Sequence, residues 1–205
     1  MAIDSETYLT IAANRRSIHA LTGESTISDE RLQELVKQVL LSTPSAFNTQ
    51  STRIIILLKD QHKKLWDIVK AAILPHVAGN PERAAATEAR LNGFHESYAT
   101  ILFYEDPSTF DHLLSLTTYA DKFEAWREQT SGMHQLALWV ALEADGMGAN
   151  VQHYNPLIDK EVLTAFPSIN PNWKLITQMV IGKPAGKPLA DRVQKPLEER
   201  FQVLQ

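Results

Sequence analysis

This chain contains no cysteine, so it can form neither disulfide bonds nor thiolate metal sites. It also lacks the glycine-rich loop that holds phosphates in mononucleotide-binding and dinucleotide-binding folds. No apolar run approaches the roughly 20 residues that cross a bilayer, and the first residues lack the cationic region and apolar core of a secretory signal. We therefore expect a cytoplasmic protein without a membrane partner.

An excess of positive charge is absent as well. The formal net charge is −4 and the pI is near 6.0, whereas surfaces that bind nucleic acids usually have a basic bias. Nucleic acid is therefore not an expected partner. The 205 residues, of which 44% are hydrophobic and 21% charged, suit one globular domain spanning residues 1–205.

Hydrophobic periodicity and turn residues predict helices that alternate with a few strands. Ser28 is the expected N-cap of the second helix, Pro81 the first residue of the fourth, and Pro75 the end of the third. The order of elements indicates an α+β or α/β fold. The predicted helices cover residues 6–14, 29–42, 61–74, 81–92, 121–145 and 159–166. The predicted strands cover residues 54–58, 99–104 and 173–181, and residues 150–152 form either a short strand or an extended link.

Two apolar patterns are clear enough to predict burial. The segment Ile54–Leu58 is almost continuously apolar and β-branched, which predicts a strand buried on both faces. In the longest predicted helix, apolar and small residues recur at helical spacing and so share one face, where alanines allow another helix to approach closely. These residues are Met133, Leu136, Ala137, Val140, Ala141 and Ala144.

The loop from Pro44 to Gln50 carries more hydrogen-bonding side chains than a turn needs. Ser45, Asn48 and Gln50 offer hydroxyl and amide groups that can read the edge of a flat heterocycle, and Phe47 offers an aromatic face beside them. The alternative is a simple connection between helix and strand that uses serine, asparagine and threonine as turn formers.

An arginine pair lies about thirty residues upstream of this loop. Arg15 and Arg16, followed by Ser17, suit the oxygens of a phosphate. The alternative is a helix C-terminus whose cations offset the helix dipole. A heterocycle edge together with a phosphate indicates a nucleotide-like cofactor, and flavin mononucleotide (FMN) fits better than a dinucleotide because the glycine fingerprint is missing.

A third segment, from Gly146 to Pro156, combines small residues with polar ones. Its glycines would let the backbone approach a ring and donate an amide hydrogen to it, or they would only cap the preceding helix. Other chemistries are not expected: His19, His134 and His153 do not follow metal-ligand spacing. The chain also has no G-x-S-x-G nucleophile elbow.

The tail from Gly182 onward is rich in proline and glycine yet keeps apolar side chains, which indicates an extended arm that lies on a partner subunit or on its own domain. Its apolar residues are Leu189, Val193, Leu197, Phe201, Val203 and Leu204. Its cations either serve solubility or include one that completes the phosphate site begun by Arg15; they are Lys183, Lys187, Arg192 and Lys195.

Taken in order, these segments resemble the FMN-dependent nitroreductase family, and within it the subgroup related to the yeast fatty-acid repression mutant protein. The resemblance covers nearly the whole chain. It rests on Asn14-Arg15-Arg16-Ser17, Pro44-Ser45-Ala46-Phe47-Asn48-Thr49-Gln50, Ser131-Gly132-Met133, Gly148-Ala149-Asn150-Val151-Gln152-His153-Tyr154-Asn155-Pro156 and Ile181-Gly182-Lys183-Pro184.

The resemblance implies an α+β fold, an α/β/α sandwich with a central, mostly antiparallel sheet. It also implies a homodimer that forms through long helices, with the C-terminal arm, about residues 182–205, around the other subunit. Two FMN molecules would lie at the dimer interface, where a small-molecule electron acceptor would meet them.

Residue roles follow from the resemblance in the same way. Arg15 and Ser17 would bind the phosphate with Arg16 beside them, and Arg192, or Lys187 as a second candidate, would reach it from the tail. The partner subunit would contribute contacts to the flavin from Ser45, Phe47, Asn48 and Gln50. The backbone near Tyr154 and Asn155 would face the N5 edge of the flavin. His19 occupies the position near the O2 edge where many members of the family have lysine. Trp66, Phe94 and Tyr98 would shape the pocket.

The implied reaction is a ping-pong transfer in which NAD(P)H gives a hydride to FMN and a nitroaromatic or quinone-like acceptor then takes the electrons. Because the flavin carries this chemistry, no side chain is expected to act as a catalytic acid or base, and no metal is needed. The alternatives are a flavin-binding regulatory protein in lipid or redox signalling with little turnover, and a plain interaction protein.

Overall fold

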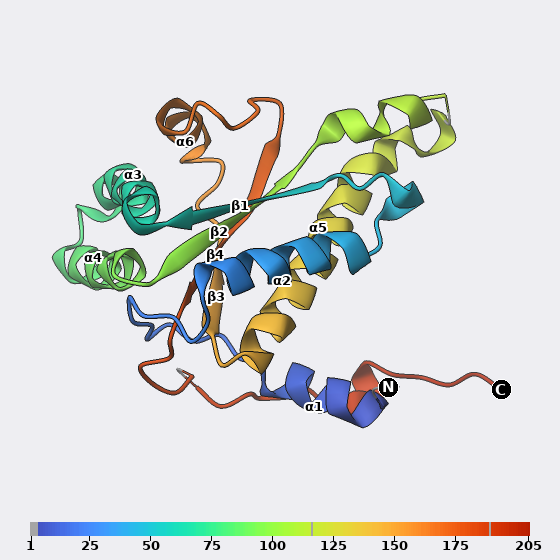
Figure 1. Ribbon diagram of the computed structural model, residues 1–205, viewed down its shortest axis with the longest axis horizontal. Helices are drawn as coiled ribbons and strands as arrows, with labels where there is room; N and C mark the ends of the chain where they lie inside the picture. Colours follow the sequence, from blue (N-terminus) through green and yellow to red (C-terminus); the bar gives the residue numbers. More distant parts are fainter. Residues whose placement is uncertain (1–3, 116, 189) are drawn as a thin grey trace.

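The computed structural model describes residues 4–115, 117–188 and 190–205 (Figure 1). Leu189, one of the apolar residues predicted in the tail, lies outside this range. The helices are α1 (Ser5–Asn14), α2 (Asp29–Ser42), α3 (Lys59–Val77), α4 (Pro81–His95), α5 (Phe123–Ala144) and α6 (Asp159–Ala165). The strands are β1 (Thr52–Leu58), β2 (Ala99–Glu105), β3 (Gly148–Gln152) and β4 (Lys174–Gly182).

The four strands form one antiparallel sheet in the order β1-β2-β4-β3. Successive side chains of β2 face opposite sides of this sheet. Leu102 therefore packs into a core with Trp66 of α3 and Phe94 of α4, whereas Ile101 packs with Leu32 of α2 and Leu138 of α5 on the other side. Helices thus cover both faces (Figure 1), which confirms the predicted α+β sandwich.

Local capping explains where α2 and α4 begin. The hydroxyl of Ser28 accepts a hydrogen bond from the backbone N–H of Arg31, as predicted. The side chain of Asn80 caps α4 in the same way, 3.0 Å from the nitrogen of Arg83, and Pro81 occupies the first turn.

The prediction that Pro75 ends the third helix is wrong, because α3 continues to Val77 with the proline inside it. A proline removes one hydrogen bond and crowds the preceding turn. Burial of Val77, two residues after the proline, offsets this cost and favours the additional turn.

The strand predicted over residues 54–58 is confirmed, but the prediction that it is buried on both faces is wrong. These residues lie in β1, which is an edge strand, and Ile54, Ile55 and Ile56 are only half-buried. The doubly buried strand is β2, all seven residues of which are buried. The order of strands in the sheet decides which apolar strand is central, and the residue pattern of a single strand does not reveal that order.

The apolar stripe predicted in the longest helix lies on α5, but much of it faces outward. Met133 is 41% exposed and Leu136 is 48% exposed. A different side of α5, with Ser131, His134 and Leu138, packs against the sheet. Periodicity identifies which residues share a face, but not what covers that face. An apolar surface of this kind marks a candidate contact with another chain.

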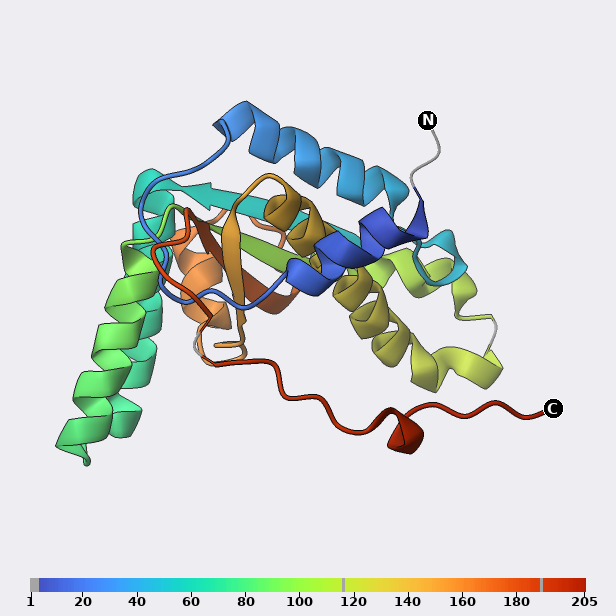
Figure 2. The ribbon, with the colours of Figure 1, turned by 90° about the horizontal axis from the view of Figure 1, so that it is seen from below.

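The tail has two parts. Its first part lies against the segment after α1, since the N–H of Ala185 donates to the carbonyl of Ala20 at 2.8 Å. Beyond Arg192 the backbone runs along the outside of the domain as an arm that is extended except for one 3-10 turn, Leu197–Glu199 (Figure 2). Its apolar side chains are exposed: Val193 is 93% exposed and Leu204 is 85% exposed. No helix in the described ranges has both the length and the apolar character needed to span a bilayer.

Candidate functional site

A cavity of about 280 Å³ lies where the segment after α1 meets the tail. Arg15, the C-cap of α1, points to it together with Arg16 and Ser17, and Arg192 closes it from the tail. The remaining lining residues are His19, Pro188 and Ala190. The structure therefore brings the predicted phosphate ligands together although they are separated by more than 170 positions. Lys187 is exposed and does not line this cavity.

Backbone contacts fix the two sides of the cavity to each other. The guanidinium of Arg192 donates to the carbonyl of Arg15 at 2.9 Å, and that of Arg16 donates to the carbonyl of Ala190. Behind them, the segment that contains Ser17 pairs with Ala149 of β3. A Cβ on Gly182 would lie only 2.4 Å from the carbonyl oxygen of Thr22, so this close approach needs glycine.

The cavity is strongly positive. Partial burial lowers the pKa of Arg15, and the neighbouring charges of Arg192 and Arg16 lower it further, against the opposing effect of Glu143. Within the described ranges, no ion pair involves Arg15, Arg16 or Arg192. Three guanidinium groups held together without a carboxylate in direct contact are suited to an anion with several oxygens.

A second cavity, of about 420 Å³, adjoins the first and shares Arg15 and Ser17 with it. Its other lining residues come from the exposed face of α5 and from β3: Gly132, Gln135, Leu136, Trp139 and Val151. The guanidinium carbon of Arg15 lies 4.3 Å from the centroid of the Trp139 ring. The two cavities together make a groove with a cationic end and a more apolar end.

The predicted ring-edge residues lie around a buried aromatic pair. Phe94 and Trp66 contact each other at 4.9 Å between centroids, and His19 lies 6.2 Å from Phe94. The edge of Tyr154 meets Trp66 at 5.8 Å. The N–H of Tyr154 donates to the Gln178 side chain at 2.8 Å, and that side chain in turn donates to the Asn155 side chain at 3.2 Å. Trp66 and Phe94 thus support His19 and Tyr154 from the core.

Tyr98, the third residue predicted to shape the pocket, does not join this cluster. Its hydroxyl donates to the carboxylate of Asp29 at the start of α2, and its ring packs on the opposite face of the sheet. The reason is the strand period: Tyr98 directly precedes β2, and α2 rather than α3 covers its side of the sheet.

Arg90 is a candidate that the sequence did not single out. It lies four residues before Phe94 on α4, so both side chains share a helix face. Burial lowers the pKa of His19, and the charge of Arg90 lowers it further. Burial raises the pKa of Tyr154, and Arg90 opposes that rise through its charge and a side-chain hydrogen bond. Burial and Arg90 both favour the neutral form of His19, whereas Arg90 itself contributes positive charge beside this cluster.

The loop with Ser45, Phe47, Asn48 and Gln50 has an unusual backbone. Phe47, Asn48 and Gln50 have φ values of 53°, 53° and 48°, in the left-handed region that side chains other than glycine rarely adopt. The hydroxyl of Ser45 accepts a hydrogen bond from the N–H of Gln50 at 2.9 Å, which closes the loop. Backbone strain of this kind is concentrated at binding sites.

This loop lies at the other end of α5 from the arginines. Phe47 is 54% exposed and contacts Trp126 with ring centroids 5.5 Å apart, whereas Arg15 contacts Trp139. Trp139 follows Trp126 by thirteen positions in α5, which is about 20 Å along the helix axis. Within one chain, the loop therefore lines neither of the two cavities that contain Arg15.

His19, His134 and His153 lie in separate places in the structure. His134 is buried, with its Nδ1 2.9 Å from the carbonyl of Thr130 and 3.2 Å from the hydroxyl of Thr52. His19 lies in the aromatic cluster, and His153 is exposed. Across the residues that the structure describes, no group of three or more potential ligands from histidine, cysteine, aspartate and glutamate comes together.

Comparison with known proteins gives consistent matches. The sequence model of the Nitroreductase family matches residues 12–183. Two Saccharomyces cerevisiae proteins described as nitroreductases are similar over most of their length: HBN1, 36% identical over 187 residues (89% of this chain, 90% of the relative), and FRM2, 31% identical over 184 residues (88% and 90%).

Solved structures agree with these matches. The nitroreductase CinD from Lactococcus lactis, in complex with chloramphenicol, superposes with a TM-score of 0.83 at 36% identity, over 97% of this chain and 100% of that chain. It has also been solved with nicotinic acid and with 4-nitrophenol. A Desulfovibrio desulfuricans protein in complex with FMN shares the fold at 20% identity and a TM-score of 0.70, over 100% of this chain and 99% of that chain.

Proposed function

Because this chain belongs to the nitroreductase family, we propose that it is a homodimeric FMN-dependent oxidoreductase that passes a hydride from NAD(P)H through the flavin to nitroaromatic or quinone-like acceptors in a ping-pong sequence. Family membership supports oxidoreductase activity. The observation that carries the cofactor assignment is the convergence of Arg15, Arg16 and Arg192 on one cavity in which no carboxylate pairs with them in the described chain.

The residues present fit FMN at both ends of the groove. A phosphate dianion would offset the like charges around Arg15, whose pKa they already lower, and Ser17 would add a hydroxyl donor. The adjoining cavity along Leu136 and Trp139 offers apolar surface to the rest of the molecule. FMN binding by the Desulfovibrio relative supports this proposal.

When bound, FMN supplies the hydride chemistry, so the protein has to bind, orient and polarise it. Arg15, Ser17 and Arg192, which line one cavity, would hold the anionic end. Arg90 places positive charge near His19 and Tyr154, where the resemblance puts the flavin ring. The exposed amides of Asn48 and Gln50 would reach the ring from the partner subunit, since they lie too far from the arginines of their own chain.

The acceptor and the dimer have separate support. Chloramphenicol and 4-nitrophenol both carry a nitrobenzene group, and their complexes with CinD favour flat nitroaromatic acceptors for this chain also. The exposed apolar side of α5, with Met133 and Leu136, and the apolar arm beyond Arg192 both offer surface that a second copy would cover.

Spectroscopy and steady-state kinetics test the proposal directly. The purified protein is expected to be yellow, with flavin absorption bands, and to oxidise NADH or NADPH when 4-nitrophenol or a quinone is supplied. Flavin absorption without steady oxidation would favour the regulatory alternative. A colourless preparation that takes up no added FMN would refute the cofactor assignment.

Replacing Arg90 by alanine is expected to make the midpoint potential of bound FMN more negative by about 20–40 mV. A nearby positive charge favours the electron-rich state, and about 30 mV corresponds to 1.4 kcal/mol for two electrons. The expected change in potential is small because Arg90 is exposed, and solvent and salt screen its charge. Potentiometric titration monitored by flavin absorbance measures the shift.

Two control variants separate charge from other effects. Arg90→Lys keeps the positive charge and should restore most of the potential, whereas Arg83→Ala removes a cation from the first turn of α4 and should leave the potential unchanged. An Arg90→Ala protein with the wild-type potential would show that this guanidinium does not act on the flavin.

A further inference from the structure

The loop that ends at Gln50 places a strained, exposed residue directly before the sheet. Gln50 has a φ value of 48° and is exposed, whereas the next residue, Ser51, is fully buried. Residues other than glycine keep such a backbone only where surrounding contacts fix it. Two hydrogen bonds do this for Gln50. Its N–H donates to the hydroxyl of Ser45 at 2.9 Å, and its carbonyl accepts from the guanidinium of Arg53 at 2.6 Å.

Arg53 is held in turn by a carboxylate. One terminal nitrogen of its guanidinium, Nη1, donates to the Gln50 carbonyl, and the other, Nη2, donates to Oδ2 of Asp106 at 3.0 Å. The planar fork of arginine holds two acceptors in a fixed relation, which the single ammonium of lysine cannot do. The side chains of Arg53 and Asp106 are only 31% and 12% exposed, so solvent screens this ion pair less than one on the open surface.

Asp106 is anchored to the central part of the sheet, because it directly follows β2. Its Oδ1 accepts hydrogen bonds from the N–H and the hydroxyl of Ser108, at 3.1 and 2.6 Å, and its own N–H donates to the carbonyl of Ser51 at 2.9 Å. Burial raises the pKa of Asp106, but the bonds from Ser108 and the charge of Arg53 outweigh it and lower the pKa. The carboxylate is therefore ionised at neutral pH and connects Gln50, through Arg53, to the core.

The contacts of the loop use its backbone and leave its exposed amides to a ligand. At the other end of the loop, the N–H of Ala46 donates to the hydroxyl of the buried Thr130 of α5 at 3.3 Å. Between these attachments lie the exposed side chains of Asn48 and Gln50. A group that is already held in its bound position loses less freedom on binding, so fixing the loop raises affinity for whatever these amides contact.

From the contacts that join Gln50, Arg53 and Asp106, we propose that Arg53 and Asp106 are positioning residues of the flavin site. They hold the backbone of Gln50 so that its side-chain amide meets the flavin. Neither residue was predicted for the site from the sequence, and neither lines the cavities that contain Arg15. This inference rests on the proposed function, because it requires FMN at the loop.

A double-mutant cycle on FMN affinity tests the proposal. Arg53→Met removes the guanidinium but keeps a long side chain beside the ring of Trp173. We expect Arg53→Met and Gln50→Ala each to raise the Kd of FMN about tenfold. The double variant should bind no more weakly than Gln50→Ala, because both changes remove the same contact. Arg53→Lys should restore part of the affinity. Fluorescence titration of the full-length proteins with FMN measures each Kd.

Visible circular dichroism at saturating FMN separates positioning from a general loss of stability. Its bands report the surroundings of the flavin ring, so Arg53→Met should change them in the same direction as Gln50→Ala. A protein that is merely less stable would keep the wild-type spectrum. Arg31→Met is the matched control, because it breaks an ion pair of 2.9 Å with Asp145 outside the site. It should keep the wild-type affinity and spectrum.

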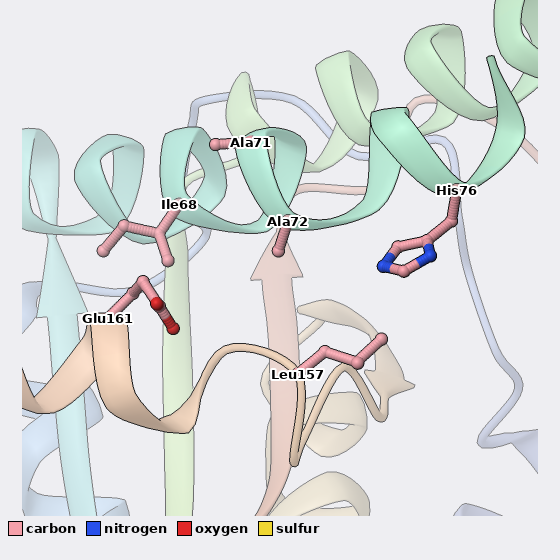
Figure 3. Close-up of a pocket in the computed structure, with 6 residues that line it drawn as sticks. All are labelled: Ile68, Ala71, Ala72, His76, Leu157 and Glu161. Carbon is pink, nitrogen blue, oxygen red and sulfur yellow. The ribbon is translucent and has the colours of Figure 1, made fainter.

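Asp106→Asn keeps the test valid if Arg53→Met does not fold. It preserves the shape of the side chain but removes its charge, and it should weaken FMN binding roughly threefold. Glu161→Gln makes the same chemical change in a pocket of about 320 Å³, where Glu161 of α6 faces Ile68 of α3 (Figure 3). No residue of the loop lines that pocket, so this variant should bind FMN like the wild type.

The outcomes distinguish this inference from the proposed function. Wild-type affinity in Arg53→Met or in Gln50→Ala, or additive effects of the two changes, would overturn the positioning role and leave FMN binding by the protein intact. A wild-type protein that binds no FMN would overturn both.

Discussion

A protein with both Arg15 and Arg192 replaced by alanine is expected to purify without FMN. Each charge-assisted hydrogen bond to a phosphate contributes about 1.5–3 kcal/mol. Loss of both would weaken binding by about 3–6 kcal/mol, or roughly 10²–10⁴-fold. The two side chains line the same cavity, and the guanidinium of Arg192 also bonds to the backbone of Arg15. Flavin absorbance per protein chain and a fluorescence titration with FMN measure the effect.

Two comparisons make this result specific. The double replacement by lysine keeps both charges but loses the planar fork of arginine, so its affinity should fall between those of the wild type and the alanine protein. Arg31→Ala removes an arginine that pairs with Asp145 outside this cavity and should retain FMN. Full flavin occupancy in the alanine double variant would refute the phosphate assignment.

A chain that ends at Arg192 is expected to dissociate into monomers at concentrations where the full-length protein is a dimer. The removed segment carries apolar side chains that are exposed in one chain: Val193, Leu197, Phe201, Val203 and Leu204. Full burial of only two of them against a partner would stabilise the dimer by about 3 kcal/mol, which corresponds to roughly 100-fold in the dissociation constant. Sedimentation velocity over a range of concentrations measures this change.

The cut leaves the arginine-lined cavity complete, because Arg192 and the contacts of Ala185 and Ala190 remain. A full-length protein with Phe201→Ser and Leu204→Ser serves as the control for chain length, because it loses apolar side chains of the arm without losing residues. Its dimer should also dissociate more readily than that of the wild type. If the truncated protein sediments like the full-length one, the arm does not hold the subunits together.

Features that depend on local chemistry were predictable from the sequence. The N-cap at Ser28, the start of α4 at Pro81 and the strands β1, β2 and β4 follow from capping, fixed dihedral angles and periodicity, whereas β3 was predicted only as one of two alternatives. The family resemblance is confirmed by the comparisons. The grouping of Arg15, Ser17 and Arg192 was predicted through that resemblance rather than from spacing.

Features that depend on which element packs against a given surface were not predictable from the sequence. The half-burial of β1 depends on sheet order, and the outward position of Met133 depends on which side of α5 meets the sheet. Arg90 escaped notice because a single cation on a polar helix usually faces solvent. Phe94 shares a face of α4 with Arg90 and contacts His19. This contact, seen in the structure, shows that Arg90 lies near His19.

The loop at Phe47 and the arginines lie toward opposite ends of α5. If the proposed FMN site is shared by two chains, dilution would remove the ligands that the second chain supplies, and loss of FMN would in turn remove contacts that join the chains. Saturation with FMN and association would then rise and fall together through mass action. Assays at nanomolar protein would report a lower specific activity than assays at micromolar protein, unless free FMN is added.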